Sequence, residues 1–208
     1  IPTVLIYGKV FNKKTNEPVS TGIQYSDIIE NKSLGIANSS PEDGSYKIVL
    51  PRGKVYQFLA EKDGFFSVSE NIDVKNLNKY QEIERNLYIS PIEVGQTARL
   101  NNIFFETNKA TLRPESTSEL NRLAALLEKT ESIKIEVSGH TDATGSDEVN
   151  VPLSSNRAKS VYDYLISQGI RRERLVFKGY GKTKPVADNT TEVGKQQNRR
   201  VEFTITAK

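Results

Sequence analysis

The sequence predicts an α+β protein, with an N-terminal all-β sandwich followed by a two-layer α/β sandwich of β-α-β-α-β-β order. Two observations lead to this class. In residues 1–90, apolar residues alternate in short runs at about ten-residue spacing, which is typical of a small β-sandwich. In residues 100–208, alternating runs are interleaved with stretches that place apolar residues on one helical face.

The first half contains several period-2 runs. Residues 46–50, 56–60, 72–74 and 83–89 each alternate apolar and polar side chains, so we expect strands there. The breaks between runs are turn sequences: Asn16-Glu17-Pro18, Asp43-Gly44, Pro51-Arg52-Gly53 and Asp63-Gly64.

Residues 91–99 are predicted to be a linker, because Pro91 and Gly95 interrupt them and the apolar period changes across them. The predicted domains are therefore residues 1–90 and 100–208.

The second half begins with an expected strand over residues 102–105 and a helix whose first residue is Pro114. That helix has one apolar face, formed by residues spaced i, i+3, i+4 and i+7: Leu120, Leu123, Ala124 and Leu127. Residues 133–137 alternate as a strand.

A polar loop follows over residues 139–153, and Ser154 is the predicted N-cap of a second helix that ends at Gly169. Residues 175–177 and 201–205 are predicted to be the last two strands, which completes the β-α-β-α-β-β order.

Composition excludes several classes of protein. The 208 residues carry a net charge of +3, all of it in residues 100–208, which is too weak to indicate nucleic-acid binding. No run approaches the roughly 20 apolar residues of a membrane-spanning helix. The absence of Cys excludes disulfides and thiol nucleophiles, and the single His makes a metal centre or catalytic triad difficult to build, so we expect no cofactor. A first residue other than Met predicts a processed protein or fragment, with any targeting signal upstream.

Arg157 and Asp142 are the residues that most suggest chemistry. Arg157 lies three positions after the expected N-cap Ser154, where a cation opposes the helix dipole, so it either points into water or awaits an anion. Asp142 follows the strand that ends at the same edge of the layer. The pair could bind the ammonium and carboxylate of a zwitterion, or could form a plain salt bridge, and the spacing favours neither.

Three other motifs are weaker. His140 could form a dyad with Asp142, but a structural role is favoured because no nucleophile is placed beside it. Residues 198–200 could clamp a phosphate, although a strand entry that pairs with nearby carboxylates is favoured. Residues 144–146 are too short for a phosphate-binding loop and lack its Lys.

The second half contains a long series of motifs at fixed spacings: Phe104 to Pro114, Gly139-His140-Thr141-Asp142, Gly145, Asn150, Leu153-Ser154, Arg157-Ala158, Val161, Tyr164-Leu165, Gly179-Tyr180-Gly181, Pro185, Asn189 and Asn198 to Glu202. With this series, residues of about 100–206 resemble the OmpA-like peptidoglycan-binding domain throughout.

The resemblance implies a non-catalytic anchor that grips the diaminopimelate residue of peptidoglycan stem peptides. The ligand-binding residues that it implies are Asp142, Arg157, Thr107, Asn108, Thr141, Asn150 and Leu153. The sequence departs from the family at Glu106-Thr107, where Asp followed by Phe or Tyr is more frequent, which leaves the contribution of Thr107 open.

The first half contains a second set of motifs, mainly at turn positions: Gly8-Lys9-Val10, Glu17-Pro18-Val19, Asp43 to Tyr46, Pro51-Arg52-Gly53 and Lys62 to Phe65. With these motifs, it resembles a carboxypeptidase regulatory-like, transthyretin-like sandwich. This resemblance implies a spacer or docking module that meets other envelope or secretion proteins.

The two resemblances together are similar to the C-terminal part of Bacteroidota envelope proteins, one of which anchors the type IX secretion machinery to peptidoglycan. They imply a periplasmic, Gram-negative protein associated with the outer membrane through an upstream segment, with no nucleic-acid partner. The alternative function is a peptidoglycan-processing hydrolase, which the lack of Cys and the single His weaken.

Overall fold

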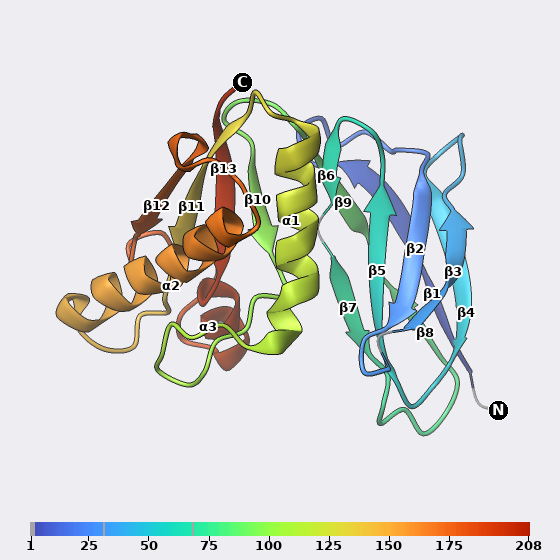
Figure 1. Cartoon of the computed structure of the whole chain (residues 1–208). Helices are drawn as coiled ribbons and strands as arrows, with labels where there is room; N and C mark the ends of the chain where they lie inside the picture. The colour runs from blue at the N-terminus through green and yellow to red at the C-terminus, as the bar shows by residue number, and fades with distance from the viewer. Residues whose placement is uncertain (1–2, 31, 68) are drawn as a thin grey trace. The chain divides into compact units, whose positions relative to one another are not determined.

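The computed structural model describes residues 3–30, 32–67 and 69–208. Two compact units are present, one up to Ile92 and one from Glu93 to Lys208 (Figure 1). The mixed α/β content that the sequence predicts is confirmed. Within the described residues, no helix is both long and apolar enough to cross a membrane.

The first unit consists of two sheets that share one core. Its strands are β1 (Thr3–Asn12), β2 (Gly22–Asp27), β3 (Lys32–Asn38), β4 (Ser45–Pro51), β5 (Val55–Glu61), β6 (Phe65–Ser67), β7 (Glu70–Asp73), β8 (Gln81–Glu84) and β9 (Leu87–Pro91). One sheet has the order β4-β1-β9-β6, with β8 also paired to β1, and the other has the order β3-β2-β5-β7.

The two sheets pack together because apolar side chains alternate with polar ones along their strands, so that one face of each sheet is apolar. In β4, Tyr46, Ile48 and Leu50 are buried while the residues between them are more exposed, and Tyr56 and Phe58 of β5 are fully buried in the same cluster. The run predicted as one strand over residues 83–89 is two strands, β8 and β9, interrupted at residues 85–86.

The second unit has one four-stranded sheet of order β10-β13-β11-β12, in which only β11 and β12 are parallel. Its elements are β10 (Thr97–Leu100), a 3₁₀ turn (Pro114–Ser116), α1 (Thr117–Lys129), β11 (Lys134–Gly139), α2 (Asp147–Ser167), a 3₁₀ turn (Arg172–Arg174), β12 (Leu175–Gly179), α3 (Glu192–Asn198) and β13 (Val201–Ala207).

Three expectations for the second unit are wrong. The first strand is β10 rather than residues 102–105, and its first three residues fall within the predicted linker of residues 91–99. Ala98 and Leu100 are each 2% exposed, and both pair with β13. The helix α3 between β12 and β13 is absent from the predicted order; it has seven residues, too few to display an apolar face.

The second helix also begins earlier than the sequence predicts. It starts at Asp147 after the N-cap Ser146, with Asp147 and Glu148 in the first turn, where the helix dipole favours acidic residues. The predicted helix start at Ser154 is therefore wrong. Pro152 lies inside the helix, which accommodates it although a proline cannot donate a backbone hydrogen bond. Arg157 therefore lies about three turns into the helix, too far from its N-terminus for the helix dipole there to act on it.

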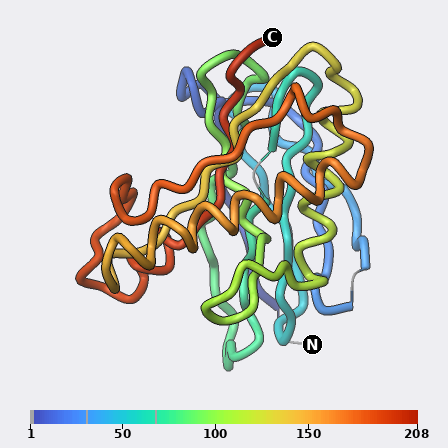
Figure 2. Tube along the Cα trace, turned by 60° about the vertical axis from the view of Figure 1, so that its left-hand side comes forward, coloured from blue at the N-terminus to red at the C-terminus, as the bar shows by residue number. Residues whose placement is uncertain are grey.

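Two glycines allow α2 to lie directly on the sheet. A Cβ at Gly139 would stand 2.1 Å from the Ser154 carbonyl oxygen, and one at Gly179 would stand 2.3 Å from the Ser155 backbone nitrogen. The loop after β12 passes the start of this helix, and Gly181 donates its backbone N–H to Ser154 Oγ at 2.9 Å (Figure 2). The middle of α2 is thus held against the ends of β11 and β12.

The position of β10 generates a prediction about truncation. A fragment of residues 93–208 should fold alone, whereas residues 101–208 should be less stable by about 2–4 kcal/mol, because Ala98 and Leu100 no longer cover the core. Urea denaturation of both fragments measures the difference. Equal stability would show that β10 adds nothing to the second unit.

Candidate binding site

The seven residues that the sequence assigns to a ligand site all line one cavity of about 740 Å³ in the second unit. They are Thr107, Asn108, Thr141, Asp142, Asn150, Leu153 and Arg157. The cavity has further lining residues that the sequence did not assign to the site: Phe105, Glu106, Thr144, Val149, Glu192, Lys195, Gln196 and Arg199.

Asp142 is buried at the end of the segment that follows β11, with 7% of its surface exposed. Its Oδ1 accepts the Thr144 backbone N–H at 2.8 Å, and its Oδ2 accepts a hydrogen bond from Arg199. Burial by itself would raise the pKa of Asp142, but these bonds outweigh it and hold that pKa below its usual range. Asp142 is therefore an anion with lone pairs still available.

Arg199 is the cation that the sequence reasoning missed. It lies at the C-terminal end of α3, forms the ion pair with Asp142, and also donates to Gln196 Oε1 at 2.6 Å. No described ion pair joins Asp142 to Arg157, so the plain salt bridge considered from the sequence involves a different arginine. The signal for Arg199 in the sequence is the motif Asn198-Arg199-Arg200. This motif was expected to pair with nearby carboxylates, but spacing alone did not identify Asp142 as one of them.

Asn198 positions the C-terminal end of α3, which carries Arg199. It is fully buried, its Oδ1 accepts the backbone N–H groups of Val186 and Ala187, and its Nδ2 donates to Ala187 O and Asn189 Oδ1. Asn189 Oδ1 in turn accepts the Ala143 backbone N–H at 3.0 Å. A chain of amide contacts therefore connects the loop after β12 to the Asp142 segment.

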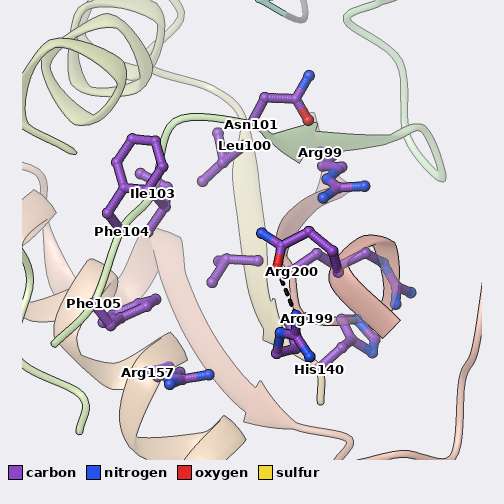
Figure 3. A pocket seen from close by; sticks show the side chains of 12 residues that line it. Arg99, Leu100, Asn101, Ile103, Phe104, Phe105, His140, Arg157, Arg199 and Arg200 are labelled. Carbon is purple, nitrogen blue, oxygen red and sulfur yellow. Dashed lines mark hydrogen bonds between the residues drawn. The ribbon is translucent and has the colours of Figure 1, made fainter. Parts of the chain in front are cut away.

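Arg157 lines the same cavity from α2, beside Phe105 (Figure 3). Its guanidinium carbon lies 5.1 Å from the centroid of the Phe105 ring, and its Nε donates to Lys109 O at 3.1 Å. Burial, together with the neighbouring positive charge of Arg199, lowers the pKa of Arg157. Its terminal nitrogens make no hydrogen bond within the described part of the chain, which leaves them available to an anion.

The loop that carries Thr107 and Asn108 is a tight turn. Glu106 and Lys109 close it by backbone bonds, Glu106 N–H to Thr111 O at 3.0 Å and Lys109 N–H to Glu106 O at 3.0 Å. Asn108 has a φ of 58°, a left-handed conformation that Asn tolerates better than most residues. Ser160 of α2 donates to Ala110 O at 2.7 Å, so α2 holds the loop at two points.

The remaining assigned residues also organise the cavity wall. Asn150 donates its Nδ2 to Thr144 O at 2.9 Å, and Thr141 Oγ1 donates to Asp142 O at 2.9 Å. Leu153 is half-buried and adds apolar surface to the cavity wall.

His140 is 3% exposed and does not form the dyad with Asp142 that the sequence allowed. Its ring stacks on Tyr180 with centroids 5.4 Å apart, and its Nε2 lies 3.3 Å from Glu202 Oε2. Burial would raise the pKa of Glu202, but His140 and Arg200 lower it to about 2. Among the described residues, no group of three or more His, Asp or Glu side chains could hold a metal ion.

The second unit is similar in sequence to known proteins. Residues 104–199, which lie in the second unit, match the model of the OmpA family. The chain is 41% identical over 105 residues to the probable lipoprotein YiaD of Escherichia coli, covering 50% of this chain and 48% of that protein. It is 39% identical over 103 residues to the peptidoglycan-binding protein ArfA of Mycobacterium tuberculosis, covering 50% of this chain and 32% of that protein.

Among solved structures, the chain is similar to the cell wall anchor of the T6SS from Pseudomonas aeruginosa. The identity is 33%, the TM-score is 0.47, and the match covers 54% of this chain and 80% of that chain. The chain spans less than half of the length of both curated relatives named above.

The low pKa of Glu202 predicts a pH-dependent contribution to stability. Its pKa in the folded chain, about 2, lies below its ordinary value of 4.5, so its ionised form stabilises the fold above pH 4.5 and this stabilisation is lost toward pH 2. The melting temperature of Glu202→Gln should therefore lie below that of the wild type near neutral pH, and the gap should close in acid. Glu173→Gln, an exposed control, should change little at any pH. A gap for Glu202→Gln that is independent of pH would contradict the prediction.

Proposed function

We propose that this chain binds the peptide stems of peptidoglycan without cleaving them, and that it holds a cell-envelope assembly to the wall. The observation that carries the proposal is the cavity that presents the Asp142 carboxylate and the Arg157 guanidinium to the same ligand space. The OmpA family match over residues 104–199 and the similarity to a protein named as peptidoglycan-binding support it.

The chemistry of the two charges selects the ligand class. Diaminopimelate ends in a carbon that bears both an ammonium and a carboxylate, and the two groups complement Asp142 and Arg157. Asp142 already accepts two hydrogen bonds from the protein, but a carboxylate has about four acceptor positions, so an ammonium can still bind. Lysine at the same position of the stem has only the ammonium.

The first unit has a separate role in this proposal. The described residues up to Ile92 form an all-β unit with its own core, which acts as a spacer or docking module for other envelope or secretion proteins. We place the chain in the periplasm of a Gram-negative bacterium, where the second unit can reach the wall.

The ligand assignment predicts a binding defect without a folding defect. Asp142→Ala and Arg157→Ala should each weaken binding of a diaminopimelate tripeptide by roughly 30- to several-thousand-fold, because each leaves one buried charge of the ligand unpaired. Calorimetric titration measures affinity, and thermal unfolding tests the fold. The wild type should also bind a lysine tripeptide much more weakly.

Lys159→Ala is the control for these variants, because Lys159 lies exposed on α2, pairs with Asp163 at 2.7 Å and does not line the cavity. Its affinity for the peptide should equal that of the wild type. Lower melting temperatures with unchanged binding in Asp142→Ala and Arg157→Ala would identify those residues as structural, and equal affinity for the two tripeptides would exclude the zwitterion model.

The non-enzymatic part of the proposal predicts binding without turnover. Purified protein should co-sediment with diaminopimelate-type sacculi and leave no soluble muropeptides in the supernatant, measured by chromatography after overnight incubation. Muropeptide release that persists in repeatedly purified protein would establish the hydrolase alternative.

A further inference from the structure

The outer face of one sheet of the first unit carries a contiguous group of large apolar side chains. In β1, Val4 and Ile6 are buried in the core, so the residues that alternate with them lie on the outer face of the sheet. The large apolar residues on this face are Leu5, Tyr7 and Phe11 of β1, Val49 of β4 and Tyr88 of β9. We call these five residues the outer apolar strip.

The outer apolar strip is open to solvent. Val49 is 63% exposed and Tyr88 is 40% exposed, while Leu5, Tyr7 and Phe11 are half-buried by their neighbours. Phe11 and Tyr88 are paired in register, and their rings stack with centroids 5.8 Å apart. An exposed apolar group with charged residues at its rim is typical of a surface that binds another protein.

The charges beside the outer apolar strip are separated by sign. Lys47 of β4 and Glu84 of β8 are both exposed, and both are in register with Tyr7, one on each side of β1. Neighbouring strands are about 4.8 Å apart, so about 10 Å separates the backbones of Lys47 and Glu84. No ion pair joins these two residues within the part of the chain that the structure describes. Both charges are therefore available to a partner.

This arrangement is complementary to itself. A two-fold axis that runs along β1 turns a second copy over, so that the two outer faces meet and left and right are exchanged. Lys47 of each copy then faces Glu84 of the other, at the level of Tyr7. A two-fold axis across the strands would instead bring each of these residues against its own counterpart, with like charges in contact. Charge therefore favours the axis along β1.

We propose that the outer apolar strip is the interface of a homodimer, in which two copies of the first unit pack face to face about this axis. The partner is a second copy because one surface supplies both the apolar centre and the two halves of the charge pairing. Three strands, about 14 Å across, over the ten residues of β1, about 33 Å, give a footprint on the order of 450 Å² per copy. This is below the roughly 800 Å² per partner of a standard interface, so the dimer is weak.

The dimer does not depend on the proposed function. Where that function holds, a dimer carries two peptide cavities, and attachment of both to a polymer of repeated stems raises the apparent affinity for the wall. Self-association is measured without peptide, so a failure of the dimer would leave the proposed function standing.

The experiment is sedimentation velocity on the full chain over a range of concentrations, with two charge-reversed variants. Lys47→Glu and Glu84→Lys should each weaken self-association by about tenfold, because each places two like-charge contacts in the dimer. An equimolar mixture of the two variants should associate as well as the wild type, because both contacts between unlike variants again join opposite charges. Both variants should keep the melting temperature of the wild type, since both side chains are exposed.

A third variant tests the apolar part of the interface. Val49→Asp buries a charge in the dimer and should also weaken self-association by about tenfold. Ile36→Asp is the matched control, because Ile36 is 65% exposed on β3 of the other sheet, and it should leave self-association unchanged. A wild type that stays monomeric at every concentration would overturn the proposal. So would a dimer that the charge reversals do not weaken, or one that mixing the two variants does not restore.

Discussion

The second unit depends on one close contact, the seating of α2 on the ends of β11 and β12. The backbone of α2 at Ser154 and Ser155 comes so near to Gly139 and Gly179 that any side chain at those two positions would overlap it. Interiors packed at this density do not yield easily, so the height and rotation of the helix are determined by the sheet. Arg157, one turn further along α2, is directed from that fixed point.

Two arginines near the cavity form ion pairs with buried carboxylates. Arg199 neutralises Asp142 and Arg200 neutralises Glu202, and each of these carboxylates keeps a pKa below its usual range although burial opposes this. Arg157 stands apart from both pairs and is stabilised by the Phe105 ring and a single carbonyl. The Asp142 carboxylate in the cavity wall is therefore already paired within the chain, while Arg157, which is proposed to bind the ligand, forms no ion pair with a carboxylate among the described residues.

Sequence patterns predicted the parts of this structure that follow from periodicity. Buried strands such as β4, β5 and β13 alternate clearly, and α1 has a regular apolar face. The patterns failed where a contact elsewhere in the chain decides the outcome. The second helix was predicted to begin at Ser154, yet α2 begins at Asp147 and continues through Pro152, where its next residues pack against the two glycines. The helix α3 is held by the buried amide of Asn198 rather than by an apolar face. For the same reason, Arg199 could not be matched to Asp142 from spacing alone, although the positions of Asp142 and Arg157 on one cavity were anticipated.

The two hydrogen bonds from α2 to the loop of residues 106–111 affect the free energy of ligand binding. Arg157 and Ser160 already hold the carbonyls of Lys109 and Ala110, so the loop is ordered before any ligand arrives. Binding to a preorganised wall loses little conformational entropy, and the main cost is the removal of water from the cavity. The attachment proposed above can therefore release and rebind along a polymer of repeated peptides without refolding any part of the second unit.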